Sequence, residues 1–451
     1  MDRQATRQRS RAARVIAARI GAASAASMLI VSGLTSSAVA EPETPVTYPK
    51  GASATRAGGL GFDTCTAPSL STLRAWRSSS FSTVNVYFGG INRGCRQPQL
   101  SRTWVREATA MGWKLMPTYV GRQPSCVIGR PMHTFSRSDA ASFGRSNARD
   151  AIKHARNLGL LPGSALYADI EHYDRSKQDC RIAVRRYISE WTKTLHASGY
   201  LSGVYVHHAS GLRDLSDSYT SSKYARPDAV WMAKWDRDTS LTGWPRTPNS
   251  RWAHAQRAKQ YRGEHKVTYG GATLKIDSNS IDAPVATVAR AYRVTSSTPL
   301  NARKGPGTSY PAVRNHAPGS TVSVICQGRG QKIGSTSVWN RLSNGSWVSD
   351  RYVSTPSSSG FSTAAVPRCA YPGQVTSGIP LNARSGPGTS HRLSGNPLPR
   401  GSLAWITCQT KGSAVDGTSV WNRLTDGRWV SDRYVSTRSG SSWSAPVPRC
   451  P

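Results

Sequence analysis

The 451-residue chain contains no apolar run long enough to cross a membrane and no cysteines in the C-x-x-C pattern. A transmembrane helix needs about 20 apolar residues, and zinc sites are commonly built from closely spaced cysteines. We therefore expect no transmembrane segment, no metal and no cofactor. Acidic residues are also scarce, because 24 Asp and Glu stand against 59 Lys and Arg, a net charge of +35. This excess predicts a polyanionic partner, either nucleic acid or an acidic surface.

The first forty residues have the pattern of a secretory signal peptide. Six arginines precede an apolar stretch of small residues from about 20 to 34, and Ala38-Val39-Ala40 has the form that signal peptidase cleaves. No Arg-Arg pair is present, which favours the general secretion route over the twin-arginine route. The alternative is a basic arm that binds nucleic acid. Because an exported protein meets the cell envelope, we expect a secreted or wall-associated protein that binds anionic wall polymers and no nucleic acid.

Cleavage after Ala40 removes six Arg and one Asp, so the net charge falls from +35 to +30. Most of the positive charge therefore belongs to the mature protein. It predicts adhesion to anionic polymers that weakens as salt screens the charges.

The last third of the chain contains an internal repeat with a period of about 81 residues. The longest shared segments are Thr-Ser-Val-Trp-Asn-Arg-Leu at 336–342 and 418–424, and Trp-Val-Ser-Asp-Arg-Tyr-Val at 347–353 and 429–435. Leu-Asn-Ala-Arg followed by Gly-Pro-Gly also occurs in both copies. Short alternating segments between Gly, Pro, Asn and Ser turns predict two small all-β barrels, at 299–369 and 380–450, after a linker at 286–298.

These repeats resemble bacterial SH3 domains, which share the Leu-Asn-x-Arg-x-Gly-Pro-Gly segment and a closing Trp-Val-x-x-x-Tyr-Val. The resemblance implies a non-catalytic module that holds an enzyme on the cell wall. Neither repeat has a pair of acids or a nucleophile beside a base, so the chemistry is expected elsewhere. The alternative for the repeated aromatic residues is that they only fill the core.

Eight cysteines form an even set, as expected for an exported protein with four disulfides. Cys326 with Cys369 and Cys408 with Cys450 occupy equivalent places in the two repeats, so one disulfide within each repeat is the simple pairing. The four early cysteines allow three pairings. We favour one that joins neighbouring strand ends, namely Cys65 with Cys95 and Cys126 with Cys180.

The segment 58–285, after a linker at 41–57, alternates strand-like and helical patterns. Helical patterns are clearest at 139–158 and 180–198, and the last two connections are weak helices. We predict an α/β fold, a (β/α)8-type, TIM-like barrel or a relative with fewer helices. Apolar runs bounded by Gly, Pro or Asn mark eight strands, at 59–64, 83–89, 114–120, 164–171, 202–207, 229–235, 254–261 and 273–279.

Four acidic residues are expected at the carboxyl ends of these strands, where barrels of this type carry their active sites. Residues i and i+2 share one face of a strand. This alternation points Asp169 and Glu171 inward together, with Asp63 from the first strand and Asp277 from the last. Nearby aromatic and amide side chains are candidate sugar-binding residues, namely Tyr87, Tyr119, Tyr205, Trp235, Gln260 and Tyr261.

Clustered carboxylates suit glycoside hydrolysis. Neighbouring negative charges raise the pKa of at least one carboxyl, so that it can hold a proton near neutral pH. One such acid protonates the leaving oxygen while a second carboxylate stabilises the charge that develops on the sugar. The alternatives are that these acids cap helices or brace loops, or that they bind calcium or magnesium. We read His172, His207 and His208 as loop or core histidines rather than metal ligands.

The ordered motifs of this segment resemble those of family 25 glycoside hydrolases, the barrel-type lysozymes. They are Gly-Phe-Asp at 61–63, Tyr-Ala-Asp-Ile-Glu at 167–171, Val-Trp-Met-Ala-Lys-Trp at 230–235, Lys-Gln-Tyr at 259–261 and Ile-Asp-Ser-Asn at 276–279. Gly-Phe-Asp-Thr-Cys at 61–65 with Val-Tyr-Phe-Gly-Gly at 86–90 is closer to an actinobacterial glycoside hydrolase-like domain.

The resemblance implies a role for each acid. It makes Glu171 the general acid/base and Asp169 the carboxylate that steadies the acetamido group or the charged intermediate. Asp63 and Asp277 become supporting acids. The expected substrate is the β-1,4 link after N-acetylmuramic acid in peptidoglycan, cleaved by a monomeric, wall-targeted, muramidase-type enzyme. The alternative is a carbohydrate-binding or wall-binding protein that keeps the cleft without turnover.

Overall fold

The computed structural model describes residues 52–451, with the exception of 130–131, 363–364, 438–441 and 445. The expected signal peptide at 1–40 and most of the expected linker at 41–57 lie outside the described residues. No helix in the described part of the chain is both long and apolar enough to span a membrane.

Eight strands close into a barrel in the order β1-β10-β9-β8-β7-β6-β3-β2. Their bounds are β1 (Thr55–Asp63), β2 (Phe81–Gly89), β3 (Lys114–Tyr119), β6 (Ala165–Ile170), β7 (Leu201–His207), β8 (Ala229–Ala233), β9 (Arg257–Tyr269) and β10 (Ala272–Val285). Each of the eight runs expected to form strands overlaps one of them. Apolar periodicity and turn residues therefore located all the strands of the barrel.

The helices are fewer than a (β/α)8 barrel has. Among the described residues there are five α-helices, α1 (Leu70–Ala75), α2 (Arg102–Ala110), α3 (Ala140–Asn157), α4 (Gln178–Ala197) and α5 (Gly211–Asp217). The last three strands account for the difference. A helix-free loop joins β8 to β9, and β10 runs antiparallel to both β9 and β1. Only Gly270 and Gly271, both at positive φ, separate β9 from β10, which suits a tight hairpin and leaves no room for a crossover helix.

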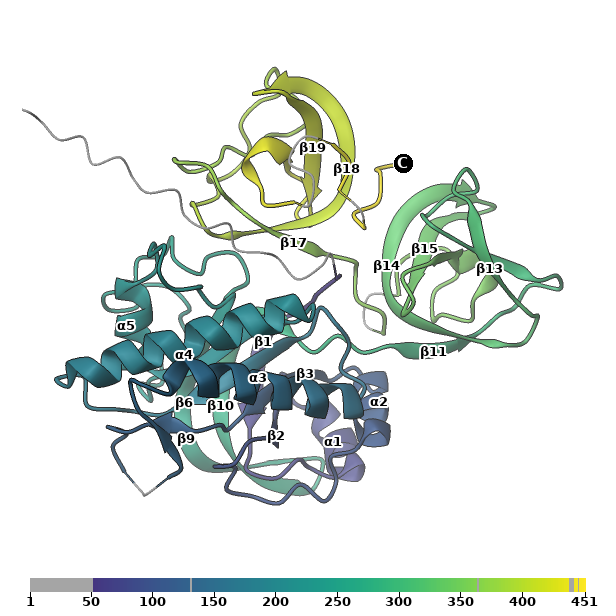
Figure 1. The fold of residues 1–451 in the computed structure, drawn as a ribbon. Coiled ribbons are helices and arrows are strands. Elements are labelled where there is room, and N and C mark those ends of the chain that lie inside the picture. The colour runs from purple at the N-terminus through teal and green to yellow at the C-terminus, as the bar shows by residue number, and fades with distance from the viewer. Residues whose placement is uncertain (1–51, 130–131, 363–364, 438–441, 445) are drawn as a thin grey trace, which may run out of the picture. The chain divides into compact units, whose positions relative to one another are not determined.

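The barrel has apolar residues on both faces of its strands. Helices α3 and α4 lie side by side over its outside (Figure 1), where they bury residues such as Phe88, Ile170 and Trp191. Inside the barrel, Tyr167 and Trp231 fill the end away from the acidic residues. Because Tyr167 lies two residues before Asp169 on β6, the same strand face supplies both the packed interior and the polar mouth.

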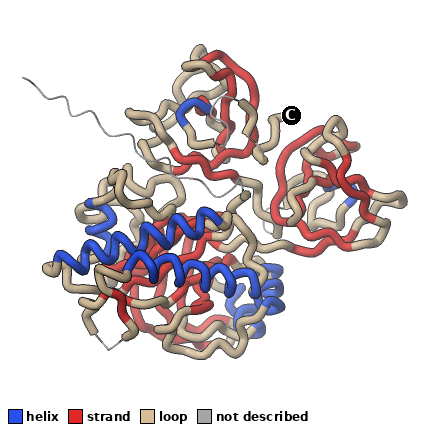
Figure 2. Tube along the Cα trace, viewed as in Figure 1, coloured by secondary structure: helices blue, strands red, loops and turns tan. Residues whose placement is uncertain are grey.

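The C-terminal part consists of strands and loops with single 3-10 turns (Figure 2). One sheet contains β11 (Arg290–Arg293), β12 (Leu300–Arg303), β13 (Ala312–His316), β14 (Thr321–Ile333), β15 (Thr336–Leu342) and β16 (Trp347–Ser349). The other contains β17 (Tyr371–Gln374), β18 (Leu403–Val415), β19 (Thr418–Leu424) and β20 (Trp429–Ser431). Strand β11 lies within the expected linker at 286–298 and pairs with β14, so regular structure begins earlier than expected.

Each repeat buries an equivalent cluster of polar side chains around an aspartate. In the first, the Asp350 carboxylate accepts hydrogen bonds from Gln327, Asn340 and Thr355 at 2.9, 2.8 and 2.7 Å. In the second, Asp432 accepts the corresponding bonds from Gln409, Asn422 and Thr437 at 3.0, 2.8 and 2.7 Å. The four disulfides are those favoured from the sequence, Cys65–Cys95, Cys126–Cys180, Cys326–Cys369 and Cys408–Cys450.

Candidate active site

A cavity of about 410 Å³ opens at the carboxyl ends of the parallel strands. All four acids expected at this mouth line it. The other lining residues come mainly from the loops after β1, β2 and β3 and from the β9–β10 hairpin. The full set is Asp63, Thr64, Cys65, Tyr87, Asn92, Arg93, Gly94, Cys95, Val120, Met132, Asp169, Glu171, Glu264, Lys275, Ile276 and Asp277.

Asp63, the last residue of β1, is held by three hydrogen-bond donors. Asn279 Nδ2 donates to Oδ1 at 2.7 Å, Tyr87 OH donates to Oδ2 at 2.9 Å, and Gln260 Nε2 lies 3.1 Å from Oδ2. The residue is only 3% exposed. Asp63 is thus held tightly within the barrel wall, with little of its side chain open to the cavity that it lines.

Gln260 on β9 links the predicted aromatic residues to the acids. Its Nε2 also donates to Asp277 Oδ2 at 3.2 Å, while its Oε1 accepts from Tyr205 OH at 3.1 Å and from Trp235 Nε1 at 2.9 Å. The alternating strand pattern therefore brought Tyr87, Tyr205 and Gln260 to one network with two of the acids. The Trp235 side chain stays 60% exposed beside the mouth, where its ring lies against Gly263.

Asp277 is positioned by an irregularity in the β9–β10 hairpin. The register shifts between Ile276 and Ser278, and the backbone N–H of Glu264 donates to Asp277 Oδ1 at 2.5 Å. Bulges often redirect a side chain next to an active site. Burial raises the pKa of Asp277. Burial also raises the pKa of Asp63 to about 7, and the negative charge of Asp277 adds to that shift.

The raised pKa of Asp63 predicts a pH dependence of stability. In the unfolded chain Asp63 ionises near its ordinary value of 3.8, whereas the folded protein holds the proton to about 7. The folded state therefore binds more protons between these values, so the free energy of unfolding should fall by a few kcal/mol as pH rises from about 4 to 7. Denaturant unfolding of the Asp63→Asn variant should show a flatter pH dependence. Asp179→Asn, at an exposed carboxylate, is the control, and equal slopes for wild type and Asp63→Asn would contradict the assignment.

Asp169 and Glu171 are two residues apart and lie on the same inner face where β6 ends. Gln123, whose side chain is fully buried, connects to the backbone on both sides of Ile170. Its Nε2 donates to the Asp169 carbonyl at 2.8 Å, and its Oε1 accepts from the Glu171 N–H at 2.9 Å. This amide fixes the backbone from which both carboxylates project.

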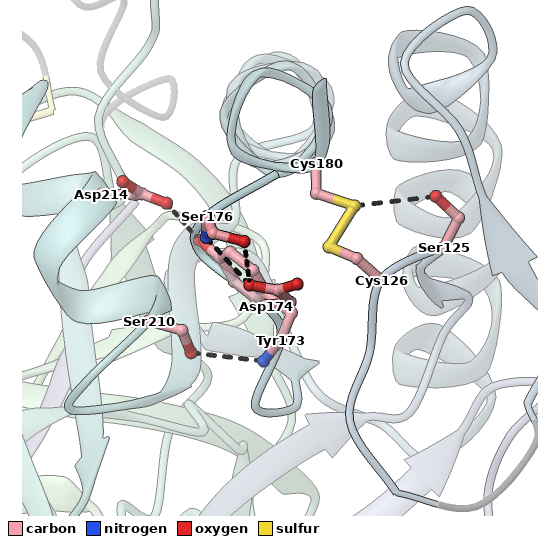
Figure 3. Close-up of a disulfide and its surroundings, with 8 residues drawn as sticks. All are labelled: Ser125, Cys126, Tyr173, Asp174, Ser176, Cys180, Ser210 and Asp214. Carbon is pink, nitrogen blue, oxygen red and sulfur yellow. Dashed lines mark hydrogen bonds between the residues drawn. A yellow bond between two sulfur atoms is a disulfide. The ribbon is translucent and has the colours of Figure 1, made fainter. Parts of the chain in front are cut away.

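The loop after Glu171 is braced against α5 and against the loop that carries Cys126, whose carbonyl accepts from the Asp174 N–H at 3.0 Å (Figure 3). Tyr173 OH donates to Asp214 Oδ2 of α5 at 2.7 Å, and the Asp174 carboxylate accepts from Ser176 N and Oγ. The Cys126–Cys180 disulfide joins the segment after β3 to α4. A carboxylate at the start of so constrained a loop has a defined position, as general acid catalysis needs.

Of the six expected sugar-binding residues, Tyr87 alone lines the cavity. Tyr205, Trp235 and Gln260 lie behind it in the hydrogen-bond network of the acids, whereas Tyr119 and Tyr261 lie outside that network. Tyr119 is 3% exposed on the outer face of β3, where its OH donates to Asp150 Oδ2 of α3 at 2.7 Å. Tyr261 follows the inward-facing Gln260 and so lies on the other face of β9. In both cases the sequence predicts an aromatic residue at the mouth because it lies at the end of an expected strand, but its neighbour occupies the inner face. The cavity lining contains neither of them.

Two residues of the site, Gln123 and Arg93, carried no clear sequence signal. Gln123 belongs to the two-residue strand β4 (Gln123–Pro124) and Arg93 to a loop, and in such short or irregular segments periodicity gives no information about direction. Asn279 did carry a signal, because it follows Asp277 by two in the Ile-Asp-Ser-Asn motif and strand alternation therefore places it on the same face. Among the described residues, no group of three or more His, Cys, Asp or Glu is arranged to hold a metal ion.

Comparison with known proteins gives a family for the barrel region. Residues 74–281 match the family described as Rv2525c-like, glycoside hydrolase-like domain. Uncharacterized protein YraI of Bacillus subtilis (strain 168) is 34% identical over 102 residues, which cover 20% of this chain and 82% of YraI.

Solved structures also match the chain. The Tat-secreted protein Rv2525c of Mycobacterium tuberculosis, in complex with L-tartrate, is 17% identical over 50% of this chain and 96% of that one, with a TM-score of 0.35. A family 25 glycosyl hydrolase from Bacillus anthracis is 15% identical over 49% and 88% of the two chains, with a TM-score of 0.32.

Proposed function

Because residues 74–281 of this chain match the Rv2525c-like family of glycoside hydrolase-like domains, we propose that the barrel cleaves the glycan strands of peptidoglycan. Glu171 is the general acid/base of this reaction, and Asp169 stabilises the acetamido group or the positive charge that forms on the sugar. The protein acts as a monomer outside the cell, where its four disulfides fit the oxidising conditions.

The observation that carries the proposal is the convergence of four carboxyl groups on one open cavity. Glycosidic bond cleavage needs a protonated carboxyl that gives its proton to the leaving oxygen. It also needs a negative charge close to the anomeric carbon, where positive charge develops in the transition state. Glu171 and Asp169 supply these groups from one rigid segment.

Asp63 and Asp277 support the reaction by sharing a proton at the mouth of the barrel. Asp63 is enclosed by three donors, and the pKa values of both acids are raised, so the pair retains a proton near neutral pH. This limits the negative charge in the floor of the cavity. Gln260 Oε1 accepts hydrogen bonds from Tyr205 and Trp235, and the exposed Trp235 ring forms a surface on which a sugar can stack.

The two C-terminal repeats are the wall-binding part of the proposal. Their SH3-like sequence pattern and the positive charge of the mature chain favour retention on peptidoglycan carboxylates and other anionic wall polymers. A bound tail raises the effective concentration of glycan at the barrel without any change in the active site.

A non-hydrolytic role is the second candidate. It is favoured by the burial of Asp63, which leaves fewer carboxylates in direct reach of a sugar than the number that lines the mouth. A protein of this kind would bind the glycan in the same cleft without cleaving it.

The deciding experiment measures new reducing ends in purified peptidoglycan treated with the mature protein, alongside sedimentation of the protein with the same material. Release of reducing ends, with none from chitin of equal mass, is the expected result. Sedimentation without release would refute the hydrolytic proposal and leave the binding role.

A further inference from the structure

The cavity at the barrel mouth has an uneven distribution of charge. Five carboxyl side chains line it, from Asp63, Asp169, Glu171, Glu264 and Asp277, against two cationic side chains. An anionic ligand group is repelled from most of this surface. It can enter only where a cation is free to receive it.

The two cations differ in their availability. Lys275 on β10 is engaged, because its Nζ lies 2.8 Å from Glu264 Oε2 on the neighbouring strand. The Arg93 guanidinium forms neither an ion pair nor a hydrogen bond with any other residue in the described part of the chain. An arginine in a cavity lined with carboxylates, yet paired with none of them, is available to a ligand.

The backbone that carries Arg93 is fixed from several sides. The neighbouring Asn92 side chain donates to the carbonyls of Gly121 and His133 at 2.8 and 2.9 Å, and its Oδ1 accepts from the His133 N–H at 2.9 Å. On the other side, the Cys65–Cys95 disulfide ties the loop to the end of β1.

Gly90 completes the anchoring of this loop. It has φ +105°, and a Cβ at this position would lie 2.1 Å from the Val120 carbonyl oxygen. The turn is thus held against the loop after β3. Arg93 is therefore presented to the cavity by a rigid segment, so ordering the loop adds little to the entropy cost of binding.

We propose that Arg93 forms an anion subsite that recognises a carboxylate substituent on the amino sugar bound in the cavity. The planar guanidinium matches a carboxylate with two parallel hydrogen bonds. The sugar ring lies towards Asp169 and Glu171, while its acidic substituent points to the loop after β2. This subsite deepens the proposed function, on which it rests, because it makes a carboxylate-bearing glycan the preferred ligand over a neutral one.

The test measures binding of a soluble tetrasaccharide that alternates N-acetylglucosamine and N-acetylmuramic acid, and of its methyl ester, by calorimetry with the full mature chain. The ester keeps the shape and removes the charge. Wild type should bind the acid form about tenfold or more tightly than the ester, as one charge-assisted bidentate contact allows. Arg93→Gln should lose this preference and bind the acid form no more tightly than the ester, because the carboxylates of the cavity then repel the acid.

Arg96→Gln is the matched control, since Arg96 lies one residue beyond Cys95, is exposed and does not line the cavity. It should keep the wild-type preference. Arg93→Lys keeps the positive charge but loses the planar guanidinium, so it should keep part of the preference for the acid form. Equal binding of acid and ester by wild type, or the same loss of preference in Arg93→Gln and Arg96→Gln, would overturn the subsite. Preference for the acid without release of reducing ends would refute hydrolysis and leave the subsite intact.

Discussion

Replacing Glu171 by Gln is expected to lower the rate of glycan cleavage by about 10²- to 10⁴-fold, the range that a positioned general acid/base contributes. Gln has nearly the same size and keeps the backbone bond from Glu171 N to Gln123 Oε1. It cannot donate a proton to the leaving oxygen or take one from water. The loss should therefore appear in kcat, with KM and wall binding little changed.

Glu264→Gln is the matched control for this experiment. Glu264 lines the same cavity, but it lies on the β9–β10 hairpin, is exposed and pairs with Lys275. Its replacement should change the rate only slightly. Reducing-end assays on purified peptidoglycan should separate the two variants. Full activity in Glu171→Gln would show that another carboxylate of the mouth is the acid, and Asp169 would then be the first to examine.

Replacing Asp350 by Ala is expected to destabilise the first C-terminal repeat by about 3 kcal/mol or more. The carboxylate is fully buried and accepts from Gln327, Asn340 and Thr355, so its removal leaves buried donors without an acceptor. Burial raises the pKa of Asp350, so removal of the charge recovers part of the desolvation cost. The lost bonds still outweigh this gain because several groups are left unsatisfied.

The second repeat offers an internal comparison, since Asp432→Ala removes the same cluster there. Hydrogen exchange followed by peptide should show faster exchange in β14 and β15 for Asp350→Ala, and in β18 and β19 for Asp432→Ala. Asp426→Ala removes a half-exposed carboxylate that pairs with the Arg428 side chain and accepts from its backbone N–H, and it should change exchange in these strands little. Exchange rates unaffected by both buried substitutions would contradict the role given to these clusters.

The sequence predicted the barrel best where strand alternation applied. The period of two placed Asp63, Asp169 and Glu171 on the inner face at one mouth, because a strand has only two faces and the apolar neighbours occupy the outer one. Asp277 also reaches this mouth, but near the start of the antiparallel β10, opposite Asp63, and not at the carboxyl end of the strand as expected. The alternation failed for Tyr119, which is itself one of those outward residues. An aromatic side chain satisfies either face, so residue type alone could not decide.

The positions of loop residues and the directions of the strands were harder to predict from the sequence. Gln123 and Arg93 obtain their positions from contacts with residues distant in the sequence, which no local pattern encodes. The antiparallel course of β10 was also missed, although the Gly270-Gly271 pair between two strand-like runs is a hairpin signal. The repeating βα pattern predicts a weak helix between the expected strands at 254–261 and 273–279. The chain instead turns back there in a hairpin.

Because β10 runs antiparallel to its neighbours, the chain enters and leaves the barrel at the same rim. Thr55 at the start of β1 lies opposite Val285 at the end of β10, so the polypeptide begins and completes the barrel at the same rim, the one remote from the acids. In a barrel of eight βα units the last strand would end at the catalytic rim and a helix would have to carry the chain back. Here the final strand makes the return itself. Segments can therefore be added before Thr55 or after Val285 without the connecting chain crossing the opening that a glycan must enter.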